Sequence, residues 1–213
     1  MKSLVQYLEE SIKKLHNKQG IIVFDIDDTL LKSDSNIIKI YKKKPGEEEI
    51  SLTTAEFAND TDAEDPKHKD WYDYRDFEDP DKIYKSIISG KPIIKNLRIM
   101  DSYINAGYKF CFLIARSNEI VVKNALDKFL RYKTSNGEMK KLNDNIFIKS
   151  MSHAINDPIK SYYGENDAEK KANVLKQLCN KYDKVVFVDD DEKNIKAAKK
   201  LNLSNLKIIK AQD

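Results

Sequence analysis

Three short, continuous apolar runs constrain the fold more than any other feature of this chain. They are Ile21–Phe24, Phe110–Ile114 and Val185–Val188, and none shows the polar alternation of a half-exposed strand. Such runs are typical of strands that are buried on both faces. Amphipathic stretches with helical spacing separate them, and this alternation predicts an α/β fold in which helices cover both faces of a parallel sheet.

The remaining core elements follow from local periodicity. Apolar residues recur at helical spacing near the N-terminus and between the apolar runs, and two weaker apolar segments follow the second and third runs. We expect helices at about 4–15, 93–104, 118–132, 168–182 and 195–201, and further strands at 145–148 and 206–209.

The segment 34–90 departs from this alternation. It holds two short strand-like stretches, at 37–41 and 50–53, around a turn at Pro45 and Gly46. The acidic, aromatic stretch Trp71–Phe77 follows and has no clear period. We therefore divide the chain into a core, residues 1–33 and 91–213, and an insert, residues 34–90, made of loops, short strands and a short helix.

Charge is spread unevenly along the chain. The net charge of +3 is too small to indicate nucleic-acid binding. Between Asp60 and Asp81, however, acidic residues outnumber basic ones by seven, so the rest of the chain carries about +10. This suits a core that handles anions beside an acidic module, although a solvated surface accounts for it equally well.

The cysteines and the N-terminus bear on the compartment. Cys111 and Cys179 lie far apart in apolar stretches, which predicts buried, reduced thiols. Four charged residues between positions 9 and 14 interrupt the N-terminal apolar pattern, so it is neither a signal peptide nor a membrane span. We expect a cytoplasmic protein with no membrane partner.

Two of the three apolar runs end directly in paired acids. Asp25 and Asp27 follow the first run, and Asp189 and Asp190 follow the third. The carboxyl ends of parallel strands lie at one edge of the sheet, so these carboxylates are expected to converge there, where they need a compensating cation. Oxygen ligands without a His or Cys cluster favour Mg²⁺. A helix cap or turn explains Asp191, and Asp189 as well, but not two strands that both end in paired acids.

The residues Asp25-Ile26-Asp27-Asp28-Thr29 resemble the DxDxT signature of the haloacid dehalogenase superfamily. The run Val188–Asn194 is similar to the fourth motif of that family, in its DDxxxN form. The resemblance covers about residues 20–33 and 91–205. It implies a Rossmann-like, three-layer core, with the insert in the position of a cap that covers the site.

The resemblance also implies a mechanism. Asp25 would be the nucleophile and form an aspartyl-phosphate, and Asp27 would donate and accept the proton. Mg²⁺ would be held by Asp25, the backbone carbonyl of Asp27 and Asp190, with Asp189 as a weaker ligand or a supporting acid. An Asp at position 27 favours a phosphatase or a phosphomutase over the other chemistries of the family.

The third family motif is a lysine that stabilises the phosphoryl group. Lys171 fits best, because it shares a helical face with Leu175 and Leu178, so its stem can lie along the core. Lys170 points about a third of a turn away and stays an alternative.

The second motif departs from the family pattern. Ile114 stands where the family usually has Thr or Ser, and it cannot donate a hydrogen bond to a phosphoryl oxygen. The backbone N–H of Ala115 and the hydroxyl of Ser117 are expected to substitute in part. Arg116 is equally well explained as a phosphate ligand or as a structural ion-pair partner. With Thr29, these are the candidate substrate-binding residues.

Together these features predict a magnesium-dependent phosphomonoester hydrolase that acts on a small phosphorylated metabolite or a nucleotide. Phosphotransfer to an acceptor other than water is one alternative. A catalytically weak phosphate- or metal-binding protein is another, favoured by Ile114. The insert aromatics either stack a nucleobase or sugar or form the insert's own core, and the acids around them make duplex nucleic acid an unlikely substrate; these aromatics are Trp71, Tyr72, Tyr74 and Phe77.

Overall fold

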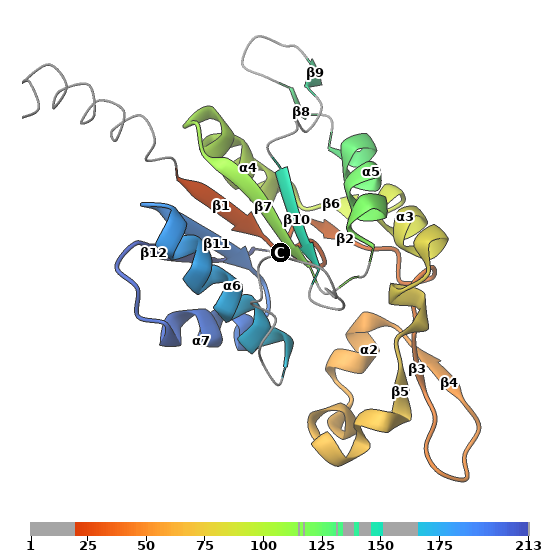
Figure 1. Ribbon diagram of the computed structural model, residues 1–213. Coiled ribbons are helices and arrows are strands. Elements are labelled where there is room, and N and C mark those ends of the chain that lie inside the picture. The colour runs from red at the N-terminus through yellow and green to blue at the C-terminus, as the bar shows by residue number, and fades with distance from the viewer. Residues whose placement is uncertain are drawn as a thin grey trace, which may run out of the picture.

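The computed structural model places most of the core and the whole insert (Figure 1). The N-terminal helix expected at 4–15 and the residues Ala115 and Ser117 lie outside the described residues. The structure describes residues 20–114, 116, 118–130, 132–133, 139–140, 146–150 and 166–212.

A five-stranded parallel sheet forms the centre of the molecule and confirms the predicted α/β fold. The three apolar runs are its three inner strands, and the two weaker segments form its edges. From edge to edge the order is β10 (Ile146–Ser150), β7 (Lys109–Ile114), β1 (Ile21–Phe24), β11 (Val185–Asp189) and β12 (Leu206–Lys210). After β10 the chain crosses to the other side of β1, so the strand order reverses beside β1.

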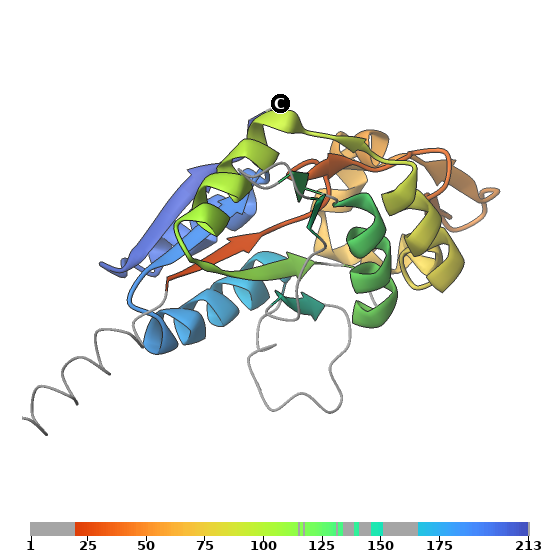
Figure 2. The same ribbon diagram turned by 90° about the horizontal axis from the view of Figure 1, so that it is seen from above.

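Helices cover both faces of this sheet. Side chains alternate along each strand, so β1 sends Ile22 and Phe24 to one face and Ile21 and Val23 to the other. Figure 2 shows α4 and α6 on opposite sides of β1 and β7. The first face packs against α3 (Pro80–Ile88), α4 (Ile94–Asn105) and α5 (Glu119–Phe129), and the second against α6 (Asp167–Lys181) and α7 (Glu192–Lys200).

The insert leaves the core through a short two-stranded ribbon and lies to one side of the sheet (Figure 1). The hairpin expected around Pro45 and Gly46 is present, with its strands paired antiparallel. The ribbon joins β2 (Leu31–Lys32) to β6 (Lys91–Pro92), and the insert holds β3 (Ile40–Lys42), β4 (Ile50–Leu52), β5 (Tyr72–Asp73), α2 (Thr54–Ala58) and three 3₁₀ helices at Thr61–Glu64, Pro66–Trp71 and Arg75–Phe77. One further ribbon pairs β8 (Tyr132–Lys133) with β9 (Met139–Lys140).

Helix α3 lies within the segment expected to form the insert, yet it packs with the core. Its Ile83 and Ile87 are fully buried in the same apolar cluster as Leu126 of α5. Asp79 caps the helix by accepting hydrogen bonds from the backbone N–H groups of Asp81 and Lys82. Helix α3 is therefore the point at which the chain returns from the insert to the core.

Two smaller predictions concern the helices and the thiols. Asp191 is the N-cap of α7, as a helix-capping role requires, so this helix begins at Glu192 rather than near Ile195. Cys111 and Cys179 are both thiols, and Cys111 is buried as predicted, but Cys179 is only half-buried. Partial burial raises the pKa of Cys179 to about 11. Among the described residues, none of the helices has the length and apolar character to cross a membrane.

Candidate active site

The acids that follow β1 and β11 meet where these two strands run side by side. Phe24 pairs with Val188, so the next residues, Asp25 and Asp189, are neighbours at the carboxyl edge of the sheet. The backbone N–H of Asp25 donates to the carbonyl of Val188 at 3.0 Å. Ligand sites of open parallel sheets lie at this edge, where the strand order reverses. The structure thus confirms that the two strand ends bring their acids together.

Lys171 joins these two acids. Its Nζ lies 2.8 Å from Asp25 Oδ1 and 2.8 Å from Asp189 Oδ2, and the whole residue is buried. Burial lowers the pKa of Lys171, but the two carboxylates outweigh this and raise the pKa above its ordinary value. Lys170 instead contacts Asp167 at the surface, at 3.3 Å. Of the two candidate lysines, only Lys171 reaches the acids.

Asp189 is fully enclosed by donors. Its Oδ1 accepts from the backbone N–H of Asp191 and from Asn194 Nδ2, both at 3.0 Å, and its Oδ2 accepts from Asn194 Nδ2 at 3.1 Å as well as from Lys171. None of its surface is exposed. This arrangement suits an acid that orients Lys171 better than one that binds a metal. Asn194 lies in the run that resembles the fourth family motif, but the sequence did not show which acid its side chain bonds.

Thr29 and Asp190 hold each other. The Thr29 hydroxyl donates to Asp190 Oδ1 at 2.8 Å and accepts from the Asp190 backbone N–H at 3.0 Å. Thr29 is fully buried, and because its hydroxyl has one proton, which it donates to Asp190, it has none to donate to a substrate. Burial raises the pKa of Asp190 to about 6. Thr29, expected to contact substrate, lies where it orients a candidate metal ligand.

Arg116 forms a two-point ion pair with Asp27. Its Nε donates to Asp27 Oδ2 at 2.8 Å and its Nη2 donates to Asp27 Oδ1. The Ser33 hydroxyl also donates to Asp27 Oδ1. Burial raises the pKa of Asp27, but Arg116 and Ser33 more than offset this and hold the pKa below its ordinary value. Of the two roles open for Arg116, the structure shows the ion pair.

A tight turn carries Asp27 and Thr29 back into the core. Leu30 and Leu31 donate their backbone N–H groups to the carbonyl of Ile26, and Asp28 takes a φ of +56°. The buried Asn96 of α4 donates its side-chain amide to the carbonyl of Thr29 at 2.7 Å. The sequence gave no signal for Asn96, because its partner lies 67 positions away.

The site brings together four carboxyl groups and two cationic side chains, which gives an excess of two negative charges when all six are ionised. Burial, with the nearby Asp189 and Asp27, raises the pKa of Asp25 well above its ordinary value, despite the Lys171 ammonium. Among the described residues, no three His, Cys, Asp or Glu side chains converge closely enough to hold a metal ion. The four carboxylates are Asp25, Asp27, Asp189 and Asp190, and the two cations are Lys171 and Arg116.

Ile114 belongs to the apolar core. It is 1% exposed and lies in the cluster of the first sheet face, with Leu126 of α5. Its neighbour Leu113 belongs to the cluster of the second face. The residue that departs from the family pattern therefore fills space between the sheet and its helices.

The insert aromatics divide into two groups. Trp71 stacks on His68 with ring centroids 3.7 Å apart, and Tyr72 is buried with its hydroxyl donating to Asp60 at 3.1 Å. Tyr74 is 42% exposed and lies edge-on to Phe57, at 5.7 Å. Trp71 and Tyr72 therefore pack within the insert. Tyr74 is partly exposed, and its ring also lies edge-on to that of Phe77, at 6.4 Å.

Comparisons with known proteins found two solved structures that are similar to this chain. No protein-family model and no curated protein matches this chain. Two crystal structures of a HAD family enzyme from Bacteroides thetaiotaomicron are similar to it. One, an aspartate-to-alanine mutant in complex with magnesium and inorganic phosphate, has a TM-score of 0.45 at 13% identity and covers 91% of this chain and 94% of its own. The other, a magnesium complex, has a TM-score of 0.43 at 15% identity, with 92% and 96% covered. Values this low assign neither an activity nor a metal to this chain.

Proposed function

We propose that this protein is a magnesium-dependent phosphomonoester hydrolase with Asp25 as its nucleophile. One observation carries the proposal: Asp25 is buried at the point where the strand order reverses, 2.8 Å from the Lys171 ammonium, in a site with two negative charges in excess. A buried carboxyl in such surroundings stays ionised, as a nucleophile must be, only with further positive charge, which one divalent cation would supply.

The chain's own carboxylates account for both halves of the reaction. An oxygen of Asp25 attacks phosphorus, the bond from phosphorus to the leaving oxygen breaks, and its electron pair departs with that oxygen. Asp27 gives the leaving oxygen a proton, and then accepts one from the water that attacks the aspartyl-phosphate and frees Asp25. Asp27 is ionised as it stands, but an incoming phosphate dianion raises its affinity for a proton.

The residues present fit Mg²⁺. Asp25, Asp190 and the backbone carbonyl of Asp27 would hold the ion, and all three offer the oxygen ligands that Mg²⁺ prefers. When bound, Mg²⁺ neutralises the charge of the carboxylates and of the phosphate. Thr29 orients Asp190 for this role, and Asp189 orients Lys171 toward the phosphoryl oxygens.

The substrate class follows from the insert. Its acidic segment repels a long polyanion, whereas the partly exposed Tyr74 could offer a stacking surface to a small molecule. We infer a small phosphorylated metabolite, with nucleotides included. A panel of sugar phosphates, nucleotides, phosphopeptides and 5′-phosphorylated DNA tests this, and a clear preference for either of the last two contradicts it.

The activity itself is tested with an aryl phosphate and Mg²⁺. Asp25→Asn should abolish phosphate release, because the amide cannot attack phosphorus. Asp28→Asn is the matched control: this exposed acid lies in the same turn, so its variant should keep most of the activity. If folded wild-type protein binds Mg²⁺ but hydrolyses no member of the panel, the reading as a non-catalytic phosphate- or metal-binding protein replaces this one.

A further inference from the structure

Arg116 has an environment that phosphate binding does not explain. The residue is 1% exposed, and it is the largest of the fully buried side chains among the described residues. A guanidinium has five N–H donors in a rigid plane. A buried arginine is costly unless all of these donors find acceptors.

All five donors of Arg116 have acceptors within the protein. Two bond to Asp27, and a third, on Nη2, donates to the Ser33 hydroxyl at 2.7 Å. The two donors of Nη1 bond to the Ser86 hydroxyl at 2.7 Å and to the carbonyl of Ile83 at 3.4 Å. No donor remains for a phosphoryl oxygen.

This arrangement fixes which part of Asp27 can carry a proton. A carboxylate has about four lone-pair positions. Among the described residues, Oδ1 accepts from both Arg116 and Ser33, and Oδ2 accepts from Arg116 alone. One position on Oδ2 is left for the exchange of a proton, and the Asp27 side chain is 32% exposed although its partner is buried.

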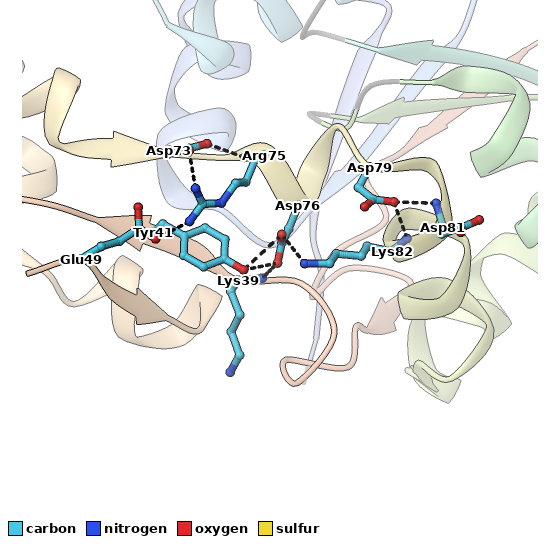
Figure 3. A network of polar contacts seen from close by, with 9 residues as sticks. All are labelled: Lys39, Tyr41, Glu49, Asp73, Arg75, Asp76, Asp79, Asp81 and Lys82. Carbon is cyan, nitrogen blue, oxygen red and sulfur yellow. Dashed lines mark hydrogen bonds and ion pairs between the residues drawn. The ribbon is translucent and has the colours of Figure 1, made fainter.

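The anchor of Arg116 is helix α3, which also holds the insert. Ile83 and Ser86 lie in the middle of α3. At its N-terminal end, Lys82 Nζ contacts the buried Asp76 at 2.6 Å (Figure 3). Asp76 also accepts from the backbone N–H of Lys39, at 3.0 Å, and from the Tyr41 hydroxyl, so it ties α3 to the insert strand β3.

We propose that Arg116 is a positioning residue for Asp27, anchored on α3 by Ser86, so that the helix carrying the insert also sets the direction in which Asp27 exchanges its proton. This inference rests on the proposed function for the role of Asp27. It assigns Arg116 no contact with the substrate.

Two esters with different needs for a proton test the proposal. An aryl phosphate has a leaving group that departs readily as an anion, whereas an alkyl phosphate needs proton donation. Acid–base catalysis contributes about 10²–10⁴-fold, so Arg116→Lys should lower kcat for the alkyl ester on the order of 10²-fold and for the aryl ester much less. KM should change little for either ester, since Arg116 does not bind phosphate.

Variants of the anchor refine this test. Ser86→Ala should lower kcat for the alkyl ester about threefold to tenfold, as loss of a single hydrogen bond predicts. Ser89→Ala is the matched control: its hydroxyl also donates to a backbone carbonyl of α3, that of Lys85, but it lies at the exposed helix end. This control should change neither rate. Equal losses for the two esters, or a raised KM in Arg116→Lys, would overturn the proposal.

A second measurement needs no turnover, so it separates this inference from the proposed function. If wild-type protein hydrolyses neither ester, the proposed function fails, and thermal unfolding still tests the linkage. Ser86→Ala should lower the melting temperature less in an Asp27→Asn background than in the wild type, because the two residues share Arg116. Additive effects of the two substitutions would contradict the link.

Discussion

Lys171 is held between two carboxylates, those of Asp25 and Asp189, and is only 4% exposed. The ammonium screens the two acids from each other and offers its charge to whatever lies against Asp25. Asn194 and the backbone N–H of Asp191 complete the bonds of Asp189. The position of Lys171 therefore depends on residues that never meet a substrate.

Replacing Lys171 by Met tests this role. The variant leaves two buried acids without their cation, so we expect the free energy of unfolding to fall by about 3–5 kcal/mol at neutral pH. Loss of one preorganised donor should also lower kcat on the order of 10²–10³-fold. Denaturant melts and phosphate release measure the two effects. Lys170→Met, one position away at the surface, should change neither, and equal behaviour of the two variants would refute the role.

At the scale of elements, strand β7 ends in Ile114, where the resembling family usually has Thr or Ser, and this residue serves packing in the core. Ile114 packs between the sheet and α5, so a hydroxyl at this position would lie among apolar side chains. The carboxyl end of β7 thus contributes packing through Ile114 and positioning through Arg116.

Ile114→Thr should therefore destabilise the protein without improving it as a catalyst. We expect the free energy of unfolding to fall by about 1–3 kcal/mol, the cost of a buried unsatisfied hydroxyl. Ile114→Val removes a methylene without adding a polar group, and should cost about 0.5–1.5 kcal/mol. Turnover that rises in Ile114→Thr would show that the hydroxyl belongs to the site after all.

The insert has its own charge cluster, in which the buried Lys42 of β3 binds the partly exposed Asp60 and Asp62 at 2.5 and 2.7 Å. Hydrogen bonds from Lys42 and Lys44 lower the pKa of Asp62 to about 2. A lowered carboxyl pKa stabilises the folded state above the ordinary pKa near 3.8, and this contribution is lost as the pH falls toward 2.

Asp62→Asn should thus lower the melting temperature at neutral pH, and the difference from wild type should shrink between about pH 4 and pH 2. Thermal melts across that range give the result. Asp70→Asn, an exposed acid of the same segment, is the control and should differ little from wild type at any pH. If the difference in melting temperature between Asp62→Asn and wild type stayed constant with pH, the lowered pKa of Asp62 would not be what stabilises the fold.

At the scale of the whole molecule, local patterns sufficed for the sheet but not for the contacts between distant segments. The apolar runs and the acids after them predicted β1, β7, β11 and the meeting of Asp25 with Asp189, because strand burial and strand ends are local properties. Helical spacing from Leu175 likewise favoured Lys171 over Lys170, and the contacts of Lys171 with Asp25 and Asp189 decide between them. Periodicity does not say which surface a helix covers, so α3 was placed with the insert. Arg116 and Asp27 lie 89 positions apart in the sequence, so no local pattern indicated their ion pair.

The charge excess of the site predicts a thermal response to Mg²⁺. At a free Mg²⁺ concentration of about 100 times the Kd, binding should add about 2.7 kcal/mol to the free energy of unfolding, and the melting temperature should rise. Asp190→Asn should weaken this response and Asp28→Asn should not. A wild-type melting temperature that responds equally to Mg²⁺ and to a monovalent salt of matched ionic strength would argue against a specific site.

The nucleophile can be identified directly. Wild-type protein is mixed with a phosphate-labelled substrate in the presence of Mg²⁺, quenched in acid within the first turnover, and digested for mass spectrometry. We predict a phosphorylated peptide with the modification on Asp25, and no label in Asp25→Asn. Phosphate release from the wild type with no protein-bound label at any quench time would mean that water attacks the substrate directly, and would contradict the covalent mechanism.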